Sequence, residues 1–365
     1  MLYQKASDWD LRVHFLDKSK NHPAGLISPH FKEGDFKNYD DVLAFAKCMD
    51  IVSIEIENVN TEALKAAEEE GIKCIPTSRT IAMIKDKGLQ KQFYKDSNLP
   101  TSAFKLYEDA DSIKQALNSG EIQYPFVQKS REAGYDGKGV SVISDESSID
   151  KLMDTPSVIE KLVDIDKELA IIVARNEKSQ IRYYQTVEMV FDPAANLLDY
   201  LLCPAEVSSD VNQTIRSLAE DLVNKLDYVG LLAIELFLDK DGQIMINEVA
   251  PRTHNSGHHT IDACNCSQFE MQLRTMLNLD LPEIKMKYNY VGIVNIVGDA
   301  DTENGPVKYH GLEKLLDNEG IFPHIYAKFD VKPFRKMGHV TVCADSKEML
   351  LDKIQLVKNN IKARS

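Results

Sequence analysis

Residues 233–250 read AIELFLDKDGQIMINEVA, two alternating apolar runs separated by Asp-Gly at 241–242. Asp-Gly between such runs is typical of a β-hairpin with a two-residue type I′ turn. Counting outward from this turn places Glu235 opposite Glu248 on one face of the hairpin. Two facing carboxylates repel each other unless a cation lies between them, or unless one of them faces solvent or pairs with a nearby arginine. Since Mg²⁺ prefers one or two carboxylates together with substrate phosphates, the hairpin predicts a magnesium site.

The second strand of this hairpin runs directly into a polar segment, EVAPRTHNSGHHT at 248–260. One histidine in a loop is most often a residue with a satisfied hydrogen bond, but three of them beside an arginine and a candidate metal carboxylate indicate a reaction centre. The candidates are Arg252, His254, Asn255, Ser256 and His258, with His259 as a weaker one.

A glycine-rich loop lies upstream, between strands predicted over 124–129 and 139–145. Its place between two strands excludes the Rossmann fingerprint, and its spacing does not match a P-loop. Glycines beside a lysine can nevertheless fold over phosphates and present backbone N–H groups, although an ordinary flexible hairpin has the same composition. The residues concerned are Lys129, Gly134, Tyr135, Asp136, Gly137, Lys138 and Gly139.

The composition narrows the class of protein. The chain has 365 residues, 43% of them hydrophobic and 27% charged, so two or three soluble subdomains are expected. A formal charge of −14 argues against a nucleic-acid binder, and neither a membrane-spanning run nor a signal-peptide pattern appears. The six scattered cysteines indicate reduced thiols, hence a cytoplasmic protein.

The order of periodic segments predicts three parts, an α/β part followed by α+β parts. Alternating strand-like and helix-like runs over 11–77 predict a doubly wound N-terminal domain, residues 1–78, with a parallel sheet. A polar helix over 81–98 opens the second part, residues 79–282, which is rich in strands and includes a small lid-like subdomain over about 105–180. Residues 283–365 form a C-terminal subdomain that ends in a helix over 347–362.

The order strand lysine, glycine loop, acidic strand and carboxylate hairpin resembles the ATP-grasp superfamily, whose two α+β subdomains hold ATP and magnesium between them. The resemblance implies a phosphate-binding role for Lys129 and the loop 134–139, and magnesium ligation by Glu235 and Glu248. Asn247 ranks lower as an ATP contact, because strict alternation points it to the other face of the strand. The remaining nucleotide contacts implied are Lys87 for ATP, Glu160, Lys161, Leu162 and Val163 for adenine, Glu168 for the ribose, and Glu188 near the nucleotide. For Glu160 and Glu168, a solvated strand edge is the alternative.

Four segments make the resemblance more specific. IEIENV at 54–59, GYDGKG at 134–139, the polar segment at 248–260 and FRKMGHV at 334–340 are similar to the N5-carboxyaminoimidazole ribonucleotide synthetase family of purine biosynthesis. The resemblance covers nearly the whole chain and implies the reaction of 5-aminoimidazole ribonucleotide, bicarbonate and ATP to give the N5-carbamate, ADP and phosphate. It also implies a carboxyphosphate intermediate, Mg²⁺, no biotin, and a homodimer.

The same resemblance assigns roles at the substrate end. Arg252 would hold the anionic intermediate bidentately, and Mg²⁺ would neutralise charge on the transferred phosphoryl group. His254, Asn255 and Ser256 would position the intermediate and the aminoimidazole, with His258 handling protons or orienting. Arg335 and Lys336 would bind the phosphate of the ribonucleotide, and Glu57, or Glu55 beside it, would close the site from the N-terminal domain, unless both face water at a strand end.

Family members normally carry a strand and a GGGQLG-type turn before the helix that begins this sequence, and both are absent here. We therefore expect a complete ATP site beside an impaired substrate site, or a start position that was chosen too late. Other activities remain open: a formate-using transformylase, against which 254–260 and 334–339 argue, biotin carboxylase, for which the chain is short, and a non-catalytic nucleotide-binding descendant.

Overall fold

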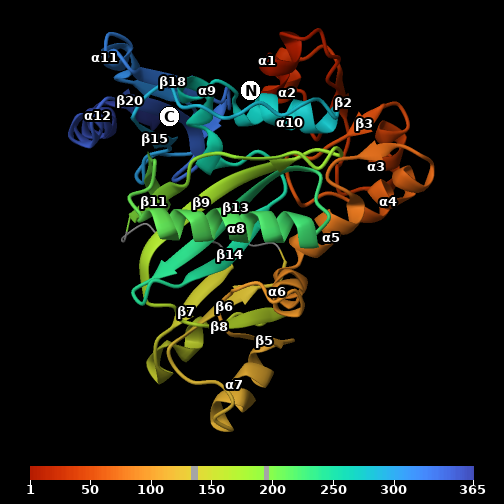
Figure 1. Ribbon diagram of the computed structural model, residues 1–365, viewed down its shortest axis with the longest axis vertical. Coiled ribbons are helices and arrows are strands. Elements are labelled where there is room, and N and C mark those ends of the chain that lie inside the picture. Colours follow the sequence, from red (N-terminus) through yellow and green to blue (C-terminus); the bar gives the residue numbers. More distant parts are fainter. Residues whose placement is uncertain (133–138, 193–196) are drawn as a thin grey trace.

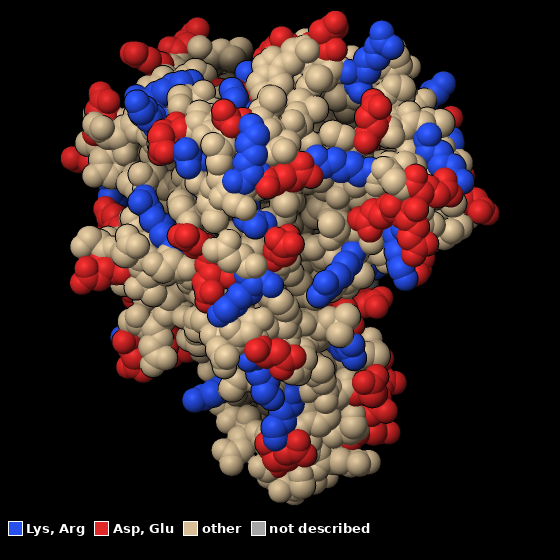
Figure 2. Space-filling view, turned by 45° about the vertical axis from the view of Figure 1, so that its right-hand side comes forward, with Lys and Arg blue, Asp and Glu red and all other residues tan. Residues whose placement is uncertain are grey.

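A computed structural model gives the structure of the chain over residues 1–132, 139–192 and 197–365. Figure 1 shows three parts around a twisted sheet: the N-terminal part on the right, a lid at the bottom and the C-terminal part at the upper left. No helix among the described residues has the length and hydropathy needed to cross a bilayer. Figure 2 shows acidic and basic side chains interspersed on one face of the molecule.

The N-terminal part has short strands between longer helices. Its elements are α1 (Leu2–Ser7), β1 (Phe15–Asp17), α2 (Pro23–Ile27), β2 (Phe31–Glu33), α3 (Tyr39–Ala46), β3 (Ile51–Val52), α4 (Thr61–Glu69), β4 (Lys73–Cys74) and α5 (Ser78–Lys85). The parallel pairing is as predicted, but β1–β2 and β3–β4 form two separate pairs rather than one sheet. The strand expected over 51–57 ends at Val52, because the backbone bends at 55–57 and carries Glu55 and Glu57 away from β3.

The polar helix predicted over 81–98 is two helices, α5 and α6 (Lys87–Asp96). Asp86 separates them with an extended backbone, φ −102° and ψ 109°. Its carboxylate accepts the N–H groups of Gly88 and Leu89 and so caps α6 instead of continuing α5. An aspartate within a periodic run therefore ended one helix and began another.

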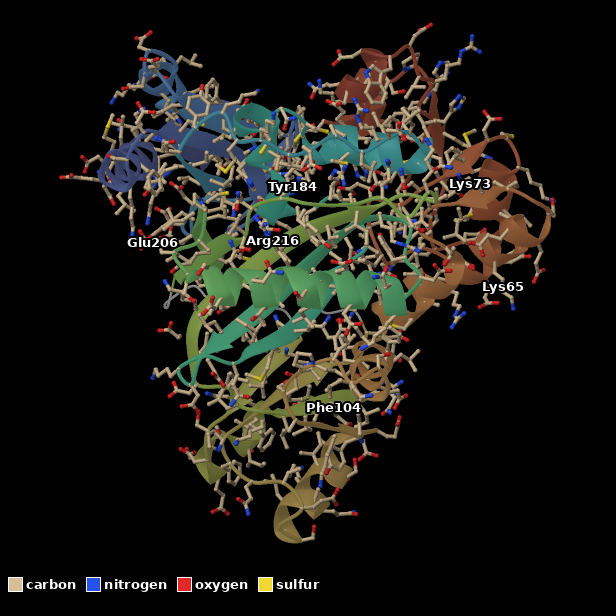
Figure 3. All side chains as sticks on the ribbon, viewed as in Figure 1. Lys65, Lys73, Phe104, Tyr184, Glu206 and Arg216 are labelled. Atoms are coloured by element: carbon tan, nitrogen blue, oxygen red, sulfur yellow. The ribbon has the colours of Figure 1, made fainter. Side chains whose placement is uncertain are left out.

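The lid is an antiparallel sheet in the order β5-β8-β6-β7, with a helix on one side. Its elements are β5 (Phe104–Tyr107), α7 (Ala110–Asn118), β6 (Phe126–Ser130), β7 (Val140–Ile143), the 3₁₀ helix η1 (Glu146–Lys151) and β8 (Ser157–Lys161). Figure 3 places Phe104 at the start of β5 in this lower part of the molecule. The lid sheet ends at Lys161, short of the limit predicted near 180, since β9 belongs to the large sheet.

The large sheet runs β14-β13-β9-β11-β12-β15-β20-β18 within the described residues, and β10 pairs with the far end of β9. The elements from its first half are β9 (Ile165–Arg175), β10 (Ile181–Tyr183), β11 (Val187–Asp192), β12 (Leu197–Cys203), α8 (Ser209–Lys225), β13 (Gly230–Asp239), β14 (Ile244–Ala250), η2 (Asn255–Gly257), α9 (Thr260–Ala263) and α10 (Gln268–Met276). The strand pairs of this sheet among the described residues are all antiparallel, and β13 pairs with both β14 and β9, so the candidate residues of these three strands lie next to one another.

Helix α8 shows why the core forms where it does. Ser208 caps it by accepting the N–H of Val211. Its buried residues recur at helical spacing, so one apolar face packs against β9, β13 and β14 (Figure 1). The opposite face of the sheet is covered by α9 and α10, where buried Tyr184 donates its hydroxyl to the carbonyl of Cys266 at 3.1 Å (Figure 3).

The C-terminal part continues the same sheet rather than forming a separate one. Its elements are β15 (Tyr290–Val297), β16 (Gly305–Pro306), β17 (Lys308–His310), α11 (Leu312–Leu316), β18 (Ile321–Ile325), β19 (Asp330–Val331), β20 (Lys336–Ala344), α12 (Lys347–Asn360) and β21 (Lys362–Arg364). β15 pairs with β12, so the strand that carries FRKMGHV lies in one sheet with the carboxylate hairpin. The N-terminal part is fixed to this body at several points, including an ion pair of 2.8 Å between Lys73 Nζ and Glu177 Oε2.

Candidate active site

The carboxylate pair lies on β13 and β14 as predicted. Glu235 is the direct cross-strand partner of Glu248. At the next residue of β13 the register differs, because Leu236 pairs with Ile246 and leaves Asn247 as an extra residue. This β-bulge bends β14 next to the carboxylates, a common place for a bulge in an active site.

The turn of the hairpin differs from the prediction. Its loop has three residues, 240–242: the N–H of Asp239 donates to the carbonyl of Gln243 across it, and the carbonyl of Asp239 accepts from the N–H of Gly242. A type I′ turn needs positive φ at both central residues, but in the described chain Gly242 (φ 80°) and not Asp241 is left-handed. The side chain of Asp239 accepts the N–H groups of Asp241 and Gln243 at 3.0 and 2.7 Å, which stabilises the wider loop.

Asn247 points into the site, and the expectation from strict alternation is wrong. Its Oδ1 accepts from Lys129 Nζ at 2.7 Å, and its Nδ2 lies 3.5 Å from Glu235 Oε2. The bulge is the reason, because the extra residue shifts the alternation of β14 by one position. Asn247 therefore joins the carboxylate hairpin to the lysine of the lid strand.

The carboxylates form a cluster with an excess of negative charge. The pKa of Glu235 is raised to about 8, first by burial and then by the charges of Glu248 and Glu168, while Lys129 and Lys336 act in the opposite direction. Burial also raises the pKa of Glu168 on β9. A site in which a carboxylate retains its proton near neutrality favours an added cation.

These carboxylates fit the chemistry of Mg²⁺ better than that of a closed metal site. No group of three or more His, Cys, Asp or Glu residues with metal-binding geometry occurs in the described parts of the chain. Glu235 and Glu248 supply hard carboxylate oxygens and leave positions for ligand oxygens. That donor set matches an ion that binds through one or two carboxylates and substrate phosphates.

Two buried lysines lie beside the cluster and share one carboxylate. Glu160 of β8 contacts Lys129 Nζ at 3.1 Å and Lys91 Nζ at 3.2 Å, through different oxygens. Lys91 also donates to the hydroxyl groups of Thr101 and Ser102 at 2.6 and 3.0 Å. Glu160 therefore bridges the two lysines and, together with Asn247 of the hairpin, holds Lys129 in place.

Ionisation of this network is finely balanced. Burial lowers the pKa of Lys91 to about 8, although Glu160 acts to raise it. Burial opposes the ionisation of Glu160 too, but Lys129 and Lys91 outweigh it and hold the pKa of Glu160 below its usual value. The negative charge of Glu160 offsets only one of the two lysine charges. These three groups therefore keep a net positive charge for an anionic ligand.

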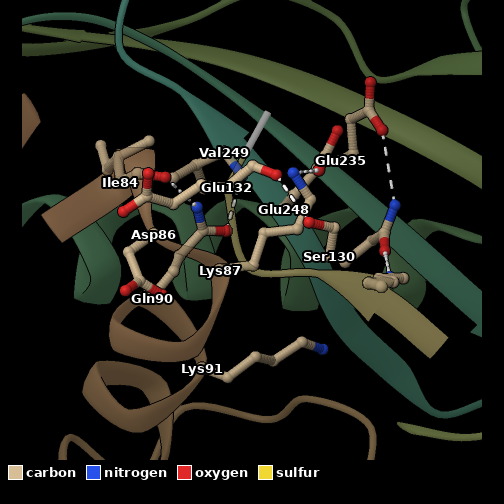
Figure 4. Close-up of polar contacts among 12 residues, drawn as sticks. Ile84, Asp86, Lys87, Gln90, Lys91, Ser130, Glu132, Glu235, Glu248 and Val249 are labelled. Atoms are coloured by element: carbon tan, nitrogen blue, oxygen red, sulfur yellow. Dashed lines mark hydrogen bonds and ion pairs between the residues drawn. The ribbon is translucent and has the colours of Figure 1, made fainter. Parts of the chain in front are cut away.

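Lys87 begins α6 and reaches Glu248 of the carboxylate pair. Its Nζ lies 3.5 Å from Glu248 Oε2 (Figure 4). The adjacent Asp86 forms a bidentate pair with Arg131, at 2.6 and 3.0 Å, where the lid strand leads into the glycine-rich loop. Of that loop, Gly139 has a positive φ of 75° and accepts through its carbonyl from the N–H of Ser130. Its other predicted ATP contacts, Gly134, Tyr135, Asp136, Gly137 and Lys138, lie outside the described residues.

The predicted adenine contacts lie at the end of β8 and directly after it, and the predicted ribose contact Glu168 lies on β9. Glu160 is buried, whereas Lys161 and Leu162 are exposed and Val163 is half-buried, so the segment 161–163 is open to a ligand. Glu188 on β11 binds Lys167 with both oxygens, at 2.8 and 2.9 Å. The structure thus brings Glu168 to the carboxylate cluster and gives Glu188 a lysine partner nearby.

Arg252 joins the polar segment to the N-terminal part. Its Nε lies 2.8 Å from Glu57 Oε1, and its Nη1 donates to the carbonyl of Thr253. Glu55 lies close to Arg252. Partial desolvation raises the pKa of Glu55 although solvent still reaches the side chain, and the charges of Arg252 and Lys328 oppose that shift. The bend at 55–57 therefore presents both glutamates to the polar segment.

His254 and Ser256 form a fixed pair next to Glu235. The N–H of Ser256 donates to His254 Nδ1 at 3.3 Å, and the Ser256 hydroxyl lies 2.9 Å from the same nitrogen. His254 Nε2 lies 3.6 Å from Glu235 Oε1. Asn255 begins η2 between them. The first residues of the polar segment are thereby brought to the carboxylate hairpin, as predicted.

The two later histidines have different surroundings. His259 is buried, contacts the carbonyl of Ser256 through Nδ1 at 3.0 Å, and has a pKa lowered by burial to about 4. His258 is half-buried, and its ring stacks on His339 of β20 at 4.7 Å, which stacks in turn on His324 of β18 at 4.6 Å. Three imidazoles thus connect the polar segment to the C-terminal part.

Arg335 and Lys336 lie at the start of β20 but have different neighbours. The charge of Lys336 acts to lower the pKa of Glu235 and of His258. Arg335 donates to the carbonyl of Asp330 at 2.6 Å. Its charge opposes the rise in the pKa of Tyr309 that burial causes. Adjacent residues of a strand point in opposite directions, so the structure brings Lys336 and not Arg335 to the carboxylate cluster.

Several site residues were not found from the sequence. Lys91 lies four residues after Lys87, on a similar face of α6, and this spacing was a usable signal. No such spacing marks Lys328 and Tyr326 as site residues, and only their contacts do. The Lys328 ammonium lies 5.6 Å from the centre of the Tyr326 ring, and the Tyr326 hydroxyl lies 2.8 Å from His339 Nδ1. Gln268 contacts two loop histidines from the next helix, and only the fold brings it there.

Comparison with known domain families gives a match for each part. Residues 1–85 match the ribonucleotide synthetase preATP-grasp domain, 92–269 the ATP-grasp domain, and 292–353 the phosphoribosylaminoimidazole carboxylase C-terminal domain. The ATP-grasp fold class predicted from the sequence is thereby confirmed.

Solved structures of similar shape carry a consistent set of names. The N5-carboxyaminoimidazole ribonucleotide synthetase from Thermotoga maritima is 34% identical with a TM-score of 0.90, over 100% of this chain and 96% of that one. The Aspergillus clavatus N5-carboxyaminoimidazole synthase, solved in complex with ADP and 5-aminoimidazole ribonucleotide, is 30% identical with a TM-score of 0.87, over 98% and 94%.

Curated relatives agree but differ in length. The N5-carboxyaminoimidazole ribonucleotide synthase of Synechococcus elongatus is 31% identical over 346 residues, which is 94% of this chain and 86% of the relative. The chloroplastic phosphoribosylaminoimidazole carboxylase of Vigna aconitifolia is 35% identical over 353 residues, 95% of this chain. The chain spans 62% of the length of this latter, longer relative.

Proposed function

Because this chain belongs to the N5-carboxyaminoimidazole ribonucleotide synthase family, we propose that it is an ATP-dependent carbon–nitrogen ligase of purine biosynthesis. It joins bicarbonate to 5-aminoimidazole ribonucleotide and yields N5-carboxyaminoimidazole ribonucleotide, ADP and phosphate. One observation carries the proposal: the Glu235–Glu248 pair, Lys129 and the Arg252–Glu57 pair gather where three parts of the chain meet.

ATP binds between the lid and the hairpin. Lys129, held by Glu160 and Asn247, and Lys87 at the start of α6 address the phosphates, together with the loop 134–139. The segment 161–163 contacts the adenine, and Glu168 and Glu188 lie on the ribose side. The net positive charge of the Lys91–Glu160–Lys129 network supports this assignment, because the ligand is an anion.

Glu235 and Glu248 hold Mg²⁺ in the working enzyme. The bound ion supplies compensation for the charge of the phosphates and of the transferred phosphoryl group. The retention of a proton by Glu235, with a pKa near 8 among the carboxylates, supports a cation at this position.

The chemistry proceeds in two transfers. An oxygen of bicarbonate attacks the γ-phosphorus of ATP, ADP leaves, and carboxyphosphate forms. The amine of the ribonucleotide then attacks the carboxyl carbon, phosphate leaves, and the nitrogen loses a proton. Arg252 holds the carboxyl oxygens through its fixed fork of donors, and its pairing with Glu57 sets the orientation of that fork.

The ribonucleotide occupies the space between the N-terminal bend and the C-terminal sheet. Glu57 and Glu55 reach it from one side, and Lys336, Lys328 and Arg335 carry positive charge for its phosphate on the other. His254, Asn255 and Ser256 lie between this space and the carboxylate hairpin and position the carboxyl group between its two reactions.

Two further properties complete the proposal. We propose a homodimer, as the family resemblance implies. Light scattering coupled to size exclusion tests it by giving the mass of one or of two copies of the 41.2 kDa chain. A cytoplasmic location is supported by the free thiols of all six cysteines.

The test of function measures ADP release from ATP, Mg²⁺ and bicarbonate with increasing 5-aminoimidazole ribonucleotide. The proposal predicts release that saturates with the ribonucleotide and requires bicarbonate. Formate in place of bicarbonate serves as the control for the transformylase alternative and leaves the rate at background. Nucleotide binding without any turnover would instead favour a non-catalytic descendant.

A further inference from the structure

Gln268, the first residue of α10, is buried and holds the polar segment by three hydrogen bonds. Its Oε1 accepts the backbone N–H of His254 at 2.8 Å, and its Nε2 donates to the carbonyl of the same residue at 2.8 Å. Its Nε2 also lies 2.9 Å from His258 Nδ1. The two contacts to one backbone residue fix the orientation of the amide, since only the oxygen can accept and only the nitrogen can donate.

The amide orientation determines the tautomer of His258. The Gln268 Nε2 is a donor only, so His258 Nδ1 has to accept from it and cannot carry a proton. The single proton of the neutral ring therefore lies on Nε2. Among the residues that the structure describes, no acceptor for this N–H is found, so it remains available to a ligand in the half-buried position of the ring.

The surroundings of the ring disfavour a second proton. His258 stacks at small angles on Phe269 at 5.9 Å and on His339 at 4.7 Å, and Tyr326 approaches edge-on at 6.2 Å. A cation between these rings would lie beside His324, which pairs with Asp262 at 2.8 Å, and beside Lys336. Burial comes first in lowering the pKa of His258 to about 3, followed by the charges of His254, Lys336, His324 and His259.

We infer that Gln268 is a positioning residue that sets the Nε2–H tautomer of His258, and that His258 is a neutral hydrogen-bond donor to the anionic substrate rather than a general base. The inference rests on the proposed function for the identity of the anion, the carboxyl group in transfer, but not for the tautomer. Of the two roles expected for His258 from the sequence, proton handling or orientation, this favours orientation: a base would need Nδ1 free to hold the second proton, and Nδ1 is occupied.

The first experiment replaces the amide by a carboxylate of the same shape. Gln268→Glu keeps the acceptor for the His254 N–H but offers an acceptor to His258 Nδ1, which favours the opposite tautomer. Gln272→Glu is the matched control: it lies one turn further on α10, is buried as well, and contacts Leu231 N and Ser53 Oγ, both of which tolerate an acceptor.

Nitrogen NMR of histidine-labelled protein reads the tautomer directly, and His258→Asn assigns its signal. We expect the Nε2–H pattern in the wild type and in Gln272→Glu, and its loss in Gln268→Glu. We also expect kcat of Gln268→Glu to fall about 10²-fold or more, as for removal of an oriented donor, with KM for ATP unchanged. A wild-type signal with Nδ1–H, or full kcat in a Gln268→Glu protein whose tautomer has changed, overturns the inference.

A second pair of variants separates a donor from a base without altering Gln268. His258→Gln retains an N–H near the position of Nε2 but cannot act as a base, whereas His258→Ala retains neither. A donor role predicts that His258→Gln keeps at least about ten times the kcat of His258→Ala. Equal loss in both, together with an acidic limb in the wild-type pH profile that both variants lack, would establish a base and refute the inference.

These outcomes are separable from failure of the proposed function. If the wild type shows no turnover with bicarbonate and the ribonucleotide, the assigned reaction is wrong, while the NMR result still decides the tautomer. If the wild type turns over and the tautomer is the opposite one, the reaction stands and the role of Gln268 falls.

Discussion

Glu235 and Glu248 face each other because two irregularities of the hairpin compensate. The loop is one residue longer than Asp-Gly predicts, and the bulge at Asn247 adds one residue to β14, so the register at the carboxylates returns to the predicted one. The same bulge turns Asn247 toward Lys129. The irregular strand thus carries both Glu248, a carboxylate proposed to hold Mg²⁺, and Asn247, which contacts Lys129.

Replacement of Glu248 by alanine should nearly abolish turnover. The variant loses one of the two carboxylates proposed for Mg²⁺ and the partner of Lys87, while Glu235 remains. We expect a loss in kcat of at least about 10²-fold that added MgCl₂ does not restore. The measurement is ADP release across a magnesium titration, and an unchanged magnesium dependence would contradict the assignment.

The charge of Glu235 should make the metal-free protein less stable as the pH rises. Its pKa is about 8 in the folded state and about 4.5 in the unfolded chain. Between these values the folded state binds more protons than the unfolded one, so stability falls as pH increases through that window. Glu235→Gln removes the titration, and thermal unfolding in EDTA should then show a flatter dependence of Tm on pH.

The control for this prediction is the wild type with excess MgCl₂ and a non-hydrolysable ATP analogue, which should regain stability at pH 8. Glu235→Gln should regain less of it. A variant whose Tm falls with pH as steeply as the wild type in EDTA would show that another group carries the dependence.

Lys91→Met should destabilise the protein because it leaves Glu160 with one lysine instead of two. Breaking a buried ion pair from one side costs about 3 kcal/mol, and the hydroxyl groups of Thr101 and Ser102 lose a donor as well. Urea unfolding measures the change. Lys95→Met, on an exposed face of the same helix, is the control and should differ from the wild type by no more than about 0.5 kcal/mol.

Arg335 and Lys336 should differ in effect although they are adjacent. Arg335→Ala should mainly raise KM for the ribonucleotide, with ATP binding intact. Lys336→Ala should lower kcat as well, because its charge acts on Glu235 and His258. Steady-state kinetics with each substrate varied in turn tests this, and a fall in ATP affinity for Arg335→Ala would contradict the separation of the two phosphate sites.

The sequence was informative where local chemistry and pairing agree. Alternation, the Asp-Gly signal and the polar segment after β14 were sufficient to bring Glu235, Glu248 and His254 together. It was misleading where a side chain competes with the backbone: Asp86 ended a periodic helix, and Asp239 widened a turn.

Other features depend on long-range contacts that a single sequence does not reveal. Gln268 and His339 reach the polar segment from a later helix and from a strand of another part, and no spacing in the chain announces those contacts. Likewise, the alternation of β14 could not place Asn247, because a bulge has no reliable sequence signal here.

The most direct test of the assigned reaction is ADP release with ATP, Mg²⁺ and bicarbonate, measured with and without 5-aminoimidazole ribonucleotide on this chain. We predict strong, saturable stimulation by the ribonucleotide, and its loss in Glu248→Ala. Release that is independent of the ribonucleotide, or absent although nucleotide binds, would contradict the assignment of this chain as a carboxylating ligase.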